Sequence, residues 1–213
     1  MPHLHTTIEA GEDDEALRLI DGGADPEEID EGRKGQRPLH LAARHGRLVV
    51  ANKLLRDKKV SVDAVFGQNV TPLYLAAQEG HLPVLNALIS AKASVDLARN
   101  DGITPLYMAA QDGHLPVLDA LISAKASVDL ANNDGCTPLF IAAQNGHSST
   151  LHSLLSAGAN PTLADKDDTT PLMAAQGRGH THAAAALKIA TLDASPLTDD
   201  ELLAAASPGL LEA

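Results

Sequence analysis

Residues 71–103 read TPLYLAAQEGHLPVLNALISAKASVDLARNDGI, and residues 104–136 read TPLYMAAQDGHLPVLDALISAKASVDLANNDGC. The two stretches differ at five positions, which are Leu75/Met108, Glu79/Asp112, Asn86/Asp119, Arg99/Asn132 and Ile103/Cys136. A sequence that repeats with a fixed period of 33 residues predicts a solenoid, in which each unit packs on its neighbours.

The same frame recurs in both directions along the chain. It continues as TPLFIAAQNGH at Thr137 and as TPLMAAQGRGH at Thr170, each 33 residues further on. Upstream it appears as RPLHLAARHGR at Arg37, and a weaker copy, LHTTIEAGE, begins at Leu4. We therefore divide a repeat domain at residues 1–194 into units of about 2–36, 37–70, 71–103, 104–136, 137–169 and 170–194, followed by a tail at 195–213.

Each unit carries signals for two short helices. Thr71 and Pro72 suit a helix start, because the hydroxyl can cap free N–H groups and proline pre-sets φ at the first helical position. Gly80 supplies permissive backbone for a turn, and Pro83 opens a second helix with an apolar stripe. The polar segment that follows ends in the turn signal Asp101-Gly102. Each period is therefore predicted to hold a helix, a turn, a second helix and an exposed hairpin-like loop.

These units resemble the ankyrin repeat. The matching features are a TPL-x-x-AA-x-x-GH first helix, a second helix carrying LL or LI, an ASVD-like segment and DG. The resemblance covers roughly residues 4–193, and five of the six units carry a TPL- or RPL-type motif. It implies an all-α solenoid of stacked helix-turn-helix units with projecting β-hairpin loops. In that family, hairpin tips and first helices line a concave groove that binds other proteins, and catalysis is not usual.

Composition fits a solenoid and narrows the function classes. The 213-residue chain is 44% hydrophobic but 2% aromatic, which suits stacked Ala- and Leu-rich helices. Its net charge of −12 argues against nucleic-acid or anionic-membrane binding. No apolar run approaches the ~18 residues of a membrane span, and residues 1–10 lack a signal peptide's features. A single cysteine is compatible with a reducing compartment, so we expect a cytoplasmic protein, with a nuclear location also open.

Neither a metal site nor a catalytic constellation is expected. Four histidines recur once per repeat after Gly, at His81, His114, His147 and His180. Neighbouring units lie about 10 Å apart, whereas a zinc ion holds nitrogen ligands at about 2.0–2.1 Å. The lone Cys136 has no specified histidine partner, and no phosphate-binding glycine motif occurs. We therefore expect no metal, no cofactor and no enzyme activity.

The first two units have opposite charge. Residues 9–31 contain eleven acidic side chains against one base, and residues 33–59 contain nine Lys and Arg against one acid. One interpretation is that the first unit is a polar cap and the two units neutralise each other. The alternative is that the acidic segment steers a basic partner, and that Arg33, Lys34 and Arg44 form a basic groove end for carboxylates or phosphates.

Two further positions depart from the family's usual residues. The fourth TPL position, where His40 has the family's histidine, holds Tyr74, Tyr107 and Phe140 in the next three units. We expect these rings to form an aromatic ladder, with direct partner contact as the alternative. Lys92 and Lys125 stand where the family commonly has Gly after the second helix, so a left-handed backbone is expected there.

The end of the chain leaves the repeat. We expect the last second helix at residues 183–192, then a break at Ser195-Pro196. Residues 198–201 form a capping box ahead of Leu202 and Leu203, which predicts a short C-terminal helix covering the last apolar face. The alternatives are a detachable partner-binding motif or a phosphorylatable Ser-Pro linker.

The family's geometry places partner contacts just before each Thr-Pro and at the end of each first helix. With the basic end, the predicted partner-binding residues are Arg33, Lys34, Arg44, Gln68, Val70, Gln78, Glu79, Asn100, Asp101, Ile103, Gln111, Asp112, Asn133, Asp134, Cys136, Gln144 and Asn145. We expect a non-catalytic scaffold or adaptor, monomeric alone, that binds another protein or an extended peptide. The alternatives are a structural subunit of a larger assembly and an enzyme.

Overall fold

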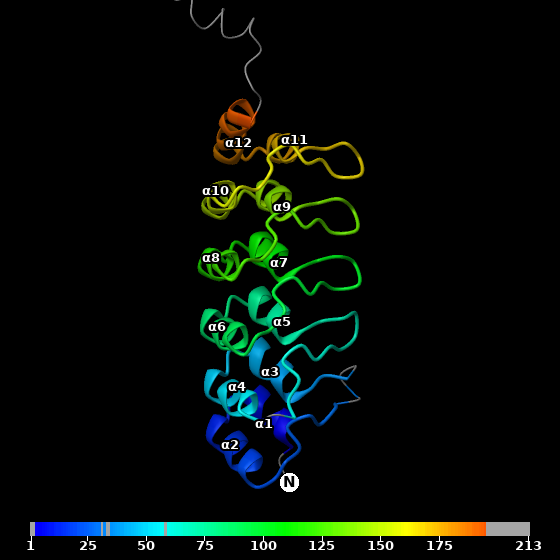
Figure 1. The fold of residues 1–213 in the computed structure, drawn as a ribbon, viewed down its shortest axis with the longest axis vertical. Helices are drawn as coiled ribbons and strands as arrows, with labels where there is room; N and C mark the ends of the chain where they lie inside the picture. The colour runs from blue at the N-terminus through cyan, green and yellow to red at the C-terminus, as the bar shows by residue number, and fades with distance from the viewer. Residues whose placement is uncertain (1–2, 31, 33–34, 58, 195–213) are drawn as a thin grey trace, which may run out of the picture.

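Two rows of helices stack along one axis, and loops project from one of the rows (Figure 1). The computed structural model describes residues 3–30, 32, 35–57 and 59–194. The helices are α1 Leu4–Ala10, α2 Asp13–Asp21, α3 Pro38–Arg44, α4 Leu48–Leu55, α5 Pro72–Gln78, α6 Leu82–Ser90, α7 Pro105–Asp112, α8 Leu115–Ser123, α9 Pro138–Asn145, α10 Ser148–Ser156, α11 Pro171–Gly177 and α12 Thr181–Ala194. The loops leave from the odd-numbered row, so the predicted all-α solenoid of helix pairs is confirmed.

Threonine caps start the first helices as the sequence predicts. The Tyr74 N–H donates to Thr71 Oγ1 at 3.1 Å, and Pro72 occupies the first helical position. The same threonine bond recurs at the start of α7, α9 and α11. In the second unit His40 accepts the Arg37 N–H at Nδ1, at 3.1 Å. Hydrogen bonds within the first turn therefore fix where each of these first helices begins, which explains why the TPL and RPL motifs predict their first residues.

Small residues let the first helices approach closely. Ala76 and Ala77 have no exposed surface, and the alanine pairs at 109–110 and 142–143 are equally buried. Leucines from both helices of a pair, such as Leu73 and Leu85, fill the remaining space and are also fully buried. Each such leucine stabilises the fold by about 1.5–3 kcal/mol, and together they form a continuous core along the stack.

The aspartate of the ASVD segment ties each unit to the next. Asp63 accepts from the Ser94 N–H at 2.9 Å and from the Ser94 hydroxyl at 2.6 Å. Asp96 accepts the same two bonds from Ser127. Because each carboxylate satisfies donors that lie 31 residues away, this ladder fixes the spacing of the loops after the second helices.

The left-handed backbone expected at two lysines is confirmed, whereas the expected bounds of the last helix are corrected. Lys92 and Lys125 are left-handed, with φ of 71° and 70°. The last helix is longer than expected, because α12 begins at Thr181 and continues to Ala194 where the other units turn into a loop. No glycine or proline interrupts residues 181–194, so nothing local ends that helix earlier. The predicted tail helix at 198–206 lies outside the described residues.

Most of the large apolar residues of the first unit pack inward. Ile8 and Ala16 are fully buried, and Leu19 and Ile20 pack against the core. Leu17 does not point inward; it lines a shallow pocket on the outer face between α2 and α4. No helix in the described part of the chain is both long and apolar enough to cross a membrane.

Candidate protein-binding surface

The loop tips are joined into one row by backbone hydrogen bonds. We call Gln68, Asn100, Asp101, Asn133 and Asp134 the tip row. The Asn100 N–H donates to the Gln68 carbonyl at 3.0 Å, and the Asn133 N–H donates to the Asp101 carbonyl at 2.8 Å. The same bond joins the next two loops at 2.9 Å. Because the backbone groups bond between tips, side chains such as Asn133 and Asp134 stay exposed at a regular spacing.

The ends of the first helices form a second row. We call Gln78, Glu79, Gln111, Asp112, Gln144 and Asn145 the helix-end row. The imidazole Nε2 of His114 donates to the Gln78 carbonyl at 3.0 Å, and that of His147 donates to the Gln111 carbonyl at 2.9 Å. The three glutamine side chains are half-buried, and the residue after each is exposed. Main-chain groups are again satisfied within the stack, so the side chains carry the surface chemistry.

The recurring histidines pack on the glycine of the preceding unit. A Cβ added at Gly80 would lie 2.9 Å from the His114 ring, and one at Gly113 would lie 2.7 Å from the His147 ring. The sequence marks these glycines as turn residues but does not show that a neighbour's imidazole needs the space. Among the described residues, no group of three or more His, Cys, Asp or Glu could hold a metal ion.

A family model described as ankyrin repeats (3 copies) matches residues 4–99 and 76–165. The chain belongs to the ankyrin-repeat family. Comparison with curated proteins finds no match. Ankyrin repeats are generally protein–protein interaction modules and are typically non-catalytic, which agrees in kind with the function expected from the sequence.

Three of the predicted contact residues lie at the base of the ankyrin loops, not at the tips. Val70, Ile103 and Cys136 are half-buried and pack against the core. Burial raises the pKa of the Cys136 thiol to about 11, and the nearby carboxylates, Asp165 first, add to the rise. The thiol is therefore protonated at neutral pH, which makes it a poor nucleophile. These residues expose less surface to a partner than the two rows do.

Of the predicted basic end, only Arg44 belongs to the described residues. Arg33 and Lys34 lie outside the described residues. Arg44 is half-buried. When the Gln36 amide is oriented with its oxygen toward Arg44, Gln36 Oε1 accepts hydrogen bonds from Arg44 Nη1 at 3.0 Å and from Arg44 Nη2 at 3.1 Å. Arg44 is thus held by the last residue of the first unit, which leaves less of it to contact a partner than the sequence suggested.

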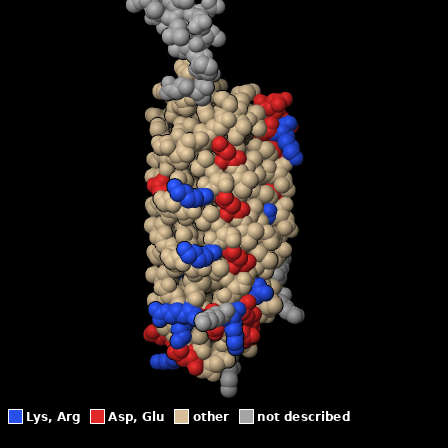
Figure 2. Space-filling view, viewed as in Figure 1, with Lys and Arg blue, Asp and Glu red and all other residues tan. Residues whose placement is uncertain are grey.

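Ion pairs join the acidic first unit to the basic second unit. Arg37 Nε lies 3.1 Å from Glu27 Oε2, and Lys53 pairs with Asp21. Near the N-terminal end, Figure 2 shows Lys and Arg side by side with Asp and Glu. These contacts support the interpretation that the two units neutralise each other, although exposed pairs such as Lys53–Asp21 contribute at most about 1 kcal/mol.

The aromatic residues are part of the core. Tyr74, Tyr107 and Phe140 are 2%, 4% and 2% exposed, so their rings offer almost no surface to a partner. The ring contact in the described part of the chain is the edge-to-face pair of His40 and Phe66, with centroids 4.8 Å apart. Tyr74, Tyr107 and Phe140 make no such contact with one another, so the expected ladder of stacked rings is not formed.

Proposed function

We propose that this ankyrin-repeat protein is a non-catalytic scaffold or adaptor that binds an extended segment of another protein along the tip row and the helix-end row. The observation that supports it most is the register of the two rows. Inter-unit bonds at 2.8–3.0 Å fix the tips, and histidine bonds at 2.9–3.0 Å fix the helix ends. A surface held this rigidly presents its side chains with little loss of entropy on binding.

The side chains of the rows favour a partner rich in hydrogen-bond donors and basic residues. Both rows consist of amides and carboxylates, and the guanidinium of Arg99 is already paired with Asp101 at 2.8 Å. Exposed carboxylates at Glu79, Asp112 and Asp134 remain for a partner. We include a cytoplasmic or nuclear location in this proposal, supported by the single cysteine.

Photocrosslinking from defined positions in the native cell tests the surface. A photoreactive residue replaces Asn133 in the tip row, and Asn86 and Asp119, exposed on α6 and α8, serve as outer-face controls. Protein adducts from position 133 with none from 86 and 119 support the proposal. Adducts from 86 and 119 alone overturn it. A structural subunit of a larger assembly would give adducts from both faces in one stable complex.

A further inference from the structure

The last helix pair leaves a partly apolar end face. Met173 occupies the position of Tyr74, Tyr107 and Phe140, but its side chain is 53% exposed, whereas theirs are at most 4% exposed. The earlier residues are covered because another unit follows each of them. Leu192 of α12 is also 64% exposed, whereas Ile189, 63% exposed, lines a pocket beside α10 and is not part of this face. The α11–α12 pair therefore ends the stack with apolar surface uncovered.

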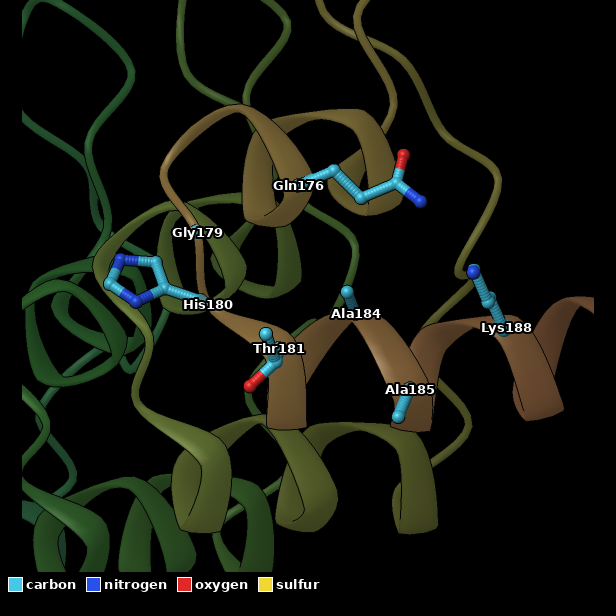
Figure 3. Close-up of a pocket in the computed structure, with 7 residues that line it drawn as sticks. All are labelled: Gln176, Gly179, His180, Thr181, Ala184, Ala185 and Lys188. Atoms are coloured by element: carbon cyan, nitrogen blue, oxygen red, sulfur yellow. The ribbon is translucent and has the colours of Figure 1, made fainter.

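A pocket of about 340 Å³ lies on this pair between α11 and α12 (Figure 3). Ala184 lies in it, and Gln176 from α11 and Lys188 from α12 extend on either side. One unit earlier, Ala143 is fully buried at the position of Gln176, and Leu155 packs against the core at the position of Lys188. The end face is thus amphipathic, with an apolar floor and polar side chains at its edges.

The charge of this end is opposite to that of the tail. Residues 170–192 contain Arg178 and Lys188 and no Asp or Glu, although the whole chain has a net charge of −12. Residues 195–213 contain Asp199, Asp200, Glu201 and Glu212 and no Lys, Arg or His. The tail therefore complements the end face in charge as well as in its apolar content, which includes Leu202 and Leu203.

We propose that residues 195–213 fold back on this end face as an intramolecular cap. The tail follows α12 directly, and α12 returns alongside α11, so the tether holds the tail at high effective concentration. Leu202 and Leu203 pack over Met173 and the Ala184 pocket, while residues 199–201 pair with Lys188 and Arg178. This proposal does not involve the tip row or the helix-end row, so its failure leaves the proposed function standing.

Methionine methyl NMR on the full chain tests the cap, because the chain has three methionines. In a Cys136→Ser background, a spin label is placed at Ser207→Cys. The Met173 methyl signal should lose most of its intensity, while Met108, in the buried core of α7, keeps its signal. Adding Leu202→Glu and Leu203→Glu should restore Met173. Lys188→Glu should restore it in part, whereas Lys166→Glu, an exposed lysine on another loop, should not.

Two results would overturn the cap. An unchanged Met173 signal in the labelled protein would show that the tail stays away from the end face. The second result comes from a mixture of two samples. One sample is isotope-labelled and has no spin label, and the other carries the spin label and no isotope. Loss of the Met173 signal in that mixture would show that a second copy, not the chain's own tail, covers this face.

Discussion

Arg99 donates a hydrogen bond from Nη1 to the Tyr74 hydroxyl at 3.0 Å. Its Nη2 donates to Gln68 Oε1 at 3.0 Å and to Asp101 Oδ2 at 2.8 Å, and the guanidinium carbon lies 5.6 Å from the centre of the Tyr74 ring. One side chain thus links a buried ring to two successive loop tips. The unit at residues 104–136 has Asn132 at this position. Asn132 Oδ1 accepts instead from the N–H groups of Asp134 and Cys136, which belong to its own loop.

Arg99→Asn should lower the free energy of unfolding by about 1–2 kcal/mol, because charge-assisted bonds to Tyr74 and Asp101 are lost. Urea denaturation of the full chain measures the change. Arg18→Asn is the matched control, since the Arg18 side chain is 78% exposed and should leave the midpoint unchanged. Equal midpoints for both variants would show that the Arg99 contacts do not stabilise the fold.

The helices were predictable because their signals are local. Thr71, Pro72 and Gly80 act within a few residues of themselves, so a single copy of the repeat reveals where its helices begin and turn. The contact of Arg99 with Tyr74 joins residues 25 positions apart, and composition does not show it. The repeat itself offered a hint of this contact. In the preceding unit, the residue at the position of Tyr74 is His40, and it contacts Phe66, which lies at a similar distance along the chain.

The sequence predicted which residues lie at the loop tips and at the ends of the first helices, but not how their side chains pack. Family geometry located the tip row and the helix-end row, whose members share a turn or a helix end. It could not show that Arg44 is held by Gln36, or that Val70 packs into the core, because these depend on side-chain packing between segments. The partner's own residues are absent from the sequence, so the surface stays a prediction until binding is measured.

Glycine at two lysine positions should stabilise the stack. Lys92 and Lys125 have φ of 71° and 70°, a region that costs a non-glycine residue roughly 1 kcal/mol, and both side chains are exposed. Lys92→Gly and Lys125→Gly should each raise the urea midpoint. Lys166→Gly is the control, because Lys166 is exposed but is not among the left-handed residues, and it should not stabilise. Lower midpoints for both left-handed variants would contradict the prediction.

Stability should fall with acid because of His40. Burial lowers the pKa of His40 from 6.5 to about 4, and its Nε2 donates to the Ala64 carbonyl at 2.9 Å. Between these two pKa values the unfolded chain binds more protons, so stability is lost as pH falls from 6.5 towards 4, by up to ~3 kcal/mol. His40→Gln should flatten this part of the pH profile, measured by urea titrations. His182→Gln, at an exposed position, should keep the profile.

Binding kinetics should separate the two predicted parts of the surface once a crosslinked partner is purified. Changing Gln78, Gln111 and Gln144 to Ala should speed dissociation, because these half-buried amides are desolvated on binding. Changing the exposed carboxylates Glu79, Asp112 and Asp134 to Lys should slow association with a basic partner and alter its salt dependence. Rate constants from surface plasmon resonance check both. Wild-type kinetics in both triple variants would place the interface elsewhere on the molecule.

A glycine that packs on the repeated histidine of the next unit should tolerate no side chain. Gly113 has φ of 73°, and an added Cβ would lie 2.7 Å from His147 Nδ1. The imidazole cannot retreat without breaking its 2.9 Å bond to the Gln111 carbonyl. Gly113→Ala should therefore cost about 2–3 kcal/mol, from the left-handed backbone and the collision together.

Gly158→Ala separates these two contributions. Gly158 has φ of 89°, but no atom lies within 4 Å of an added Cβ, so this variant should show the backbone cost alone, about 1 kcal/mol. Urea denaturation of both variants gives the difference, which measures the packing of one ankyrin unit on the next. If the two variants lose the same stability, His147 adjusts freely and the glycine is required for its backbone conformation alone.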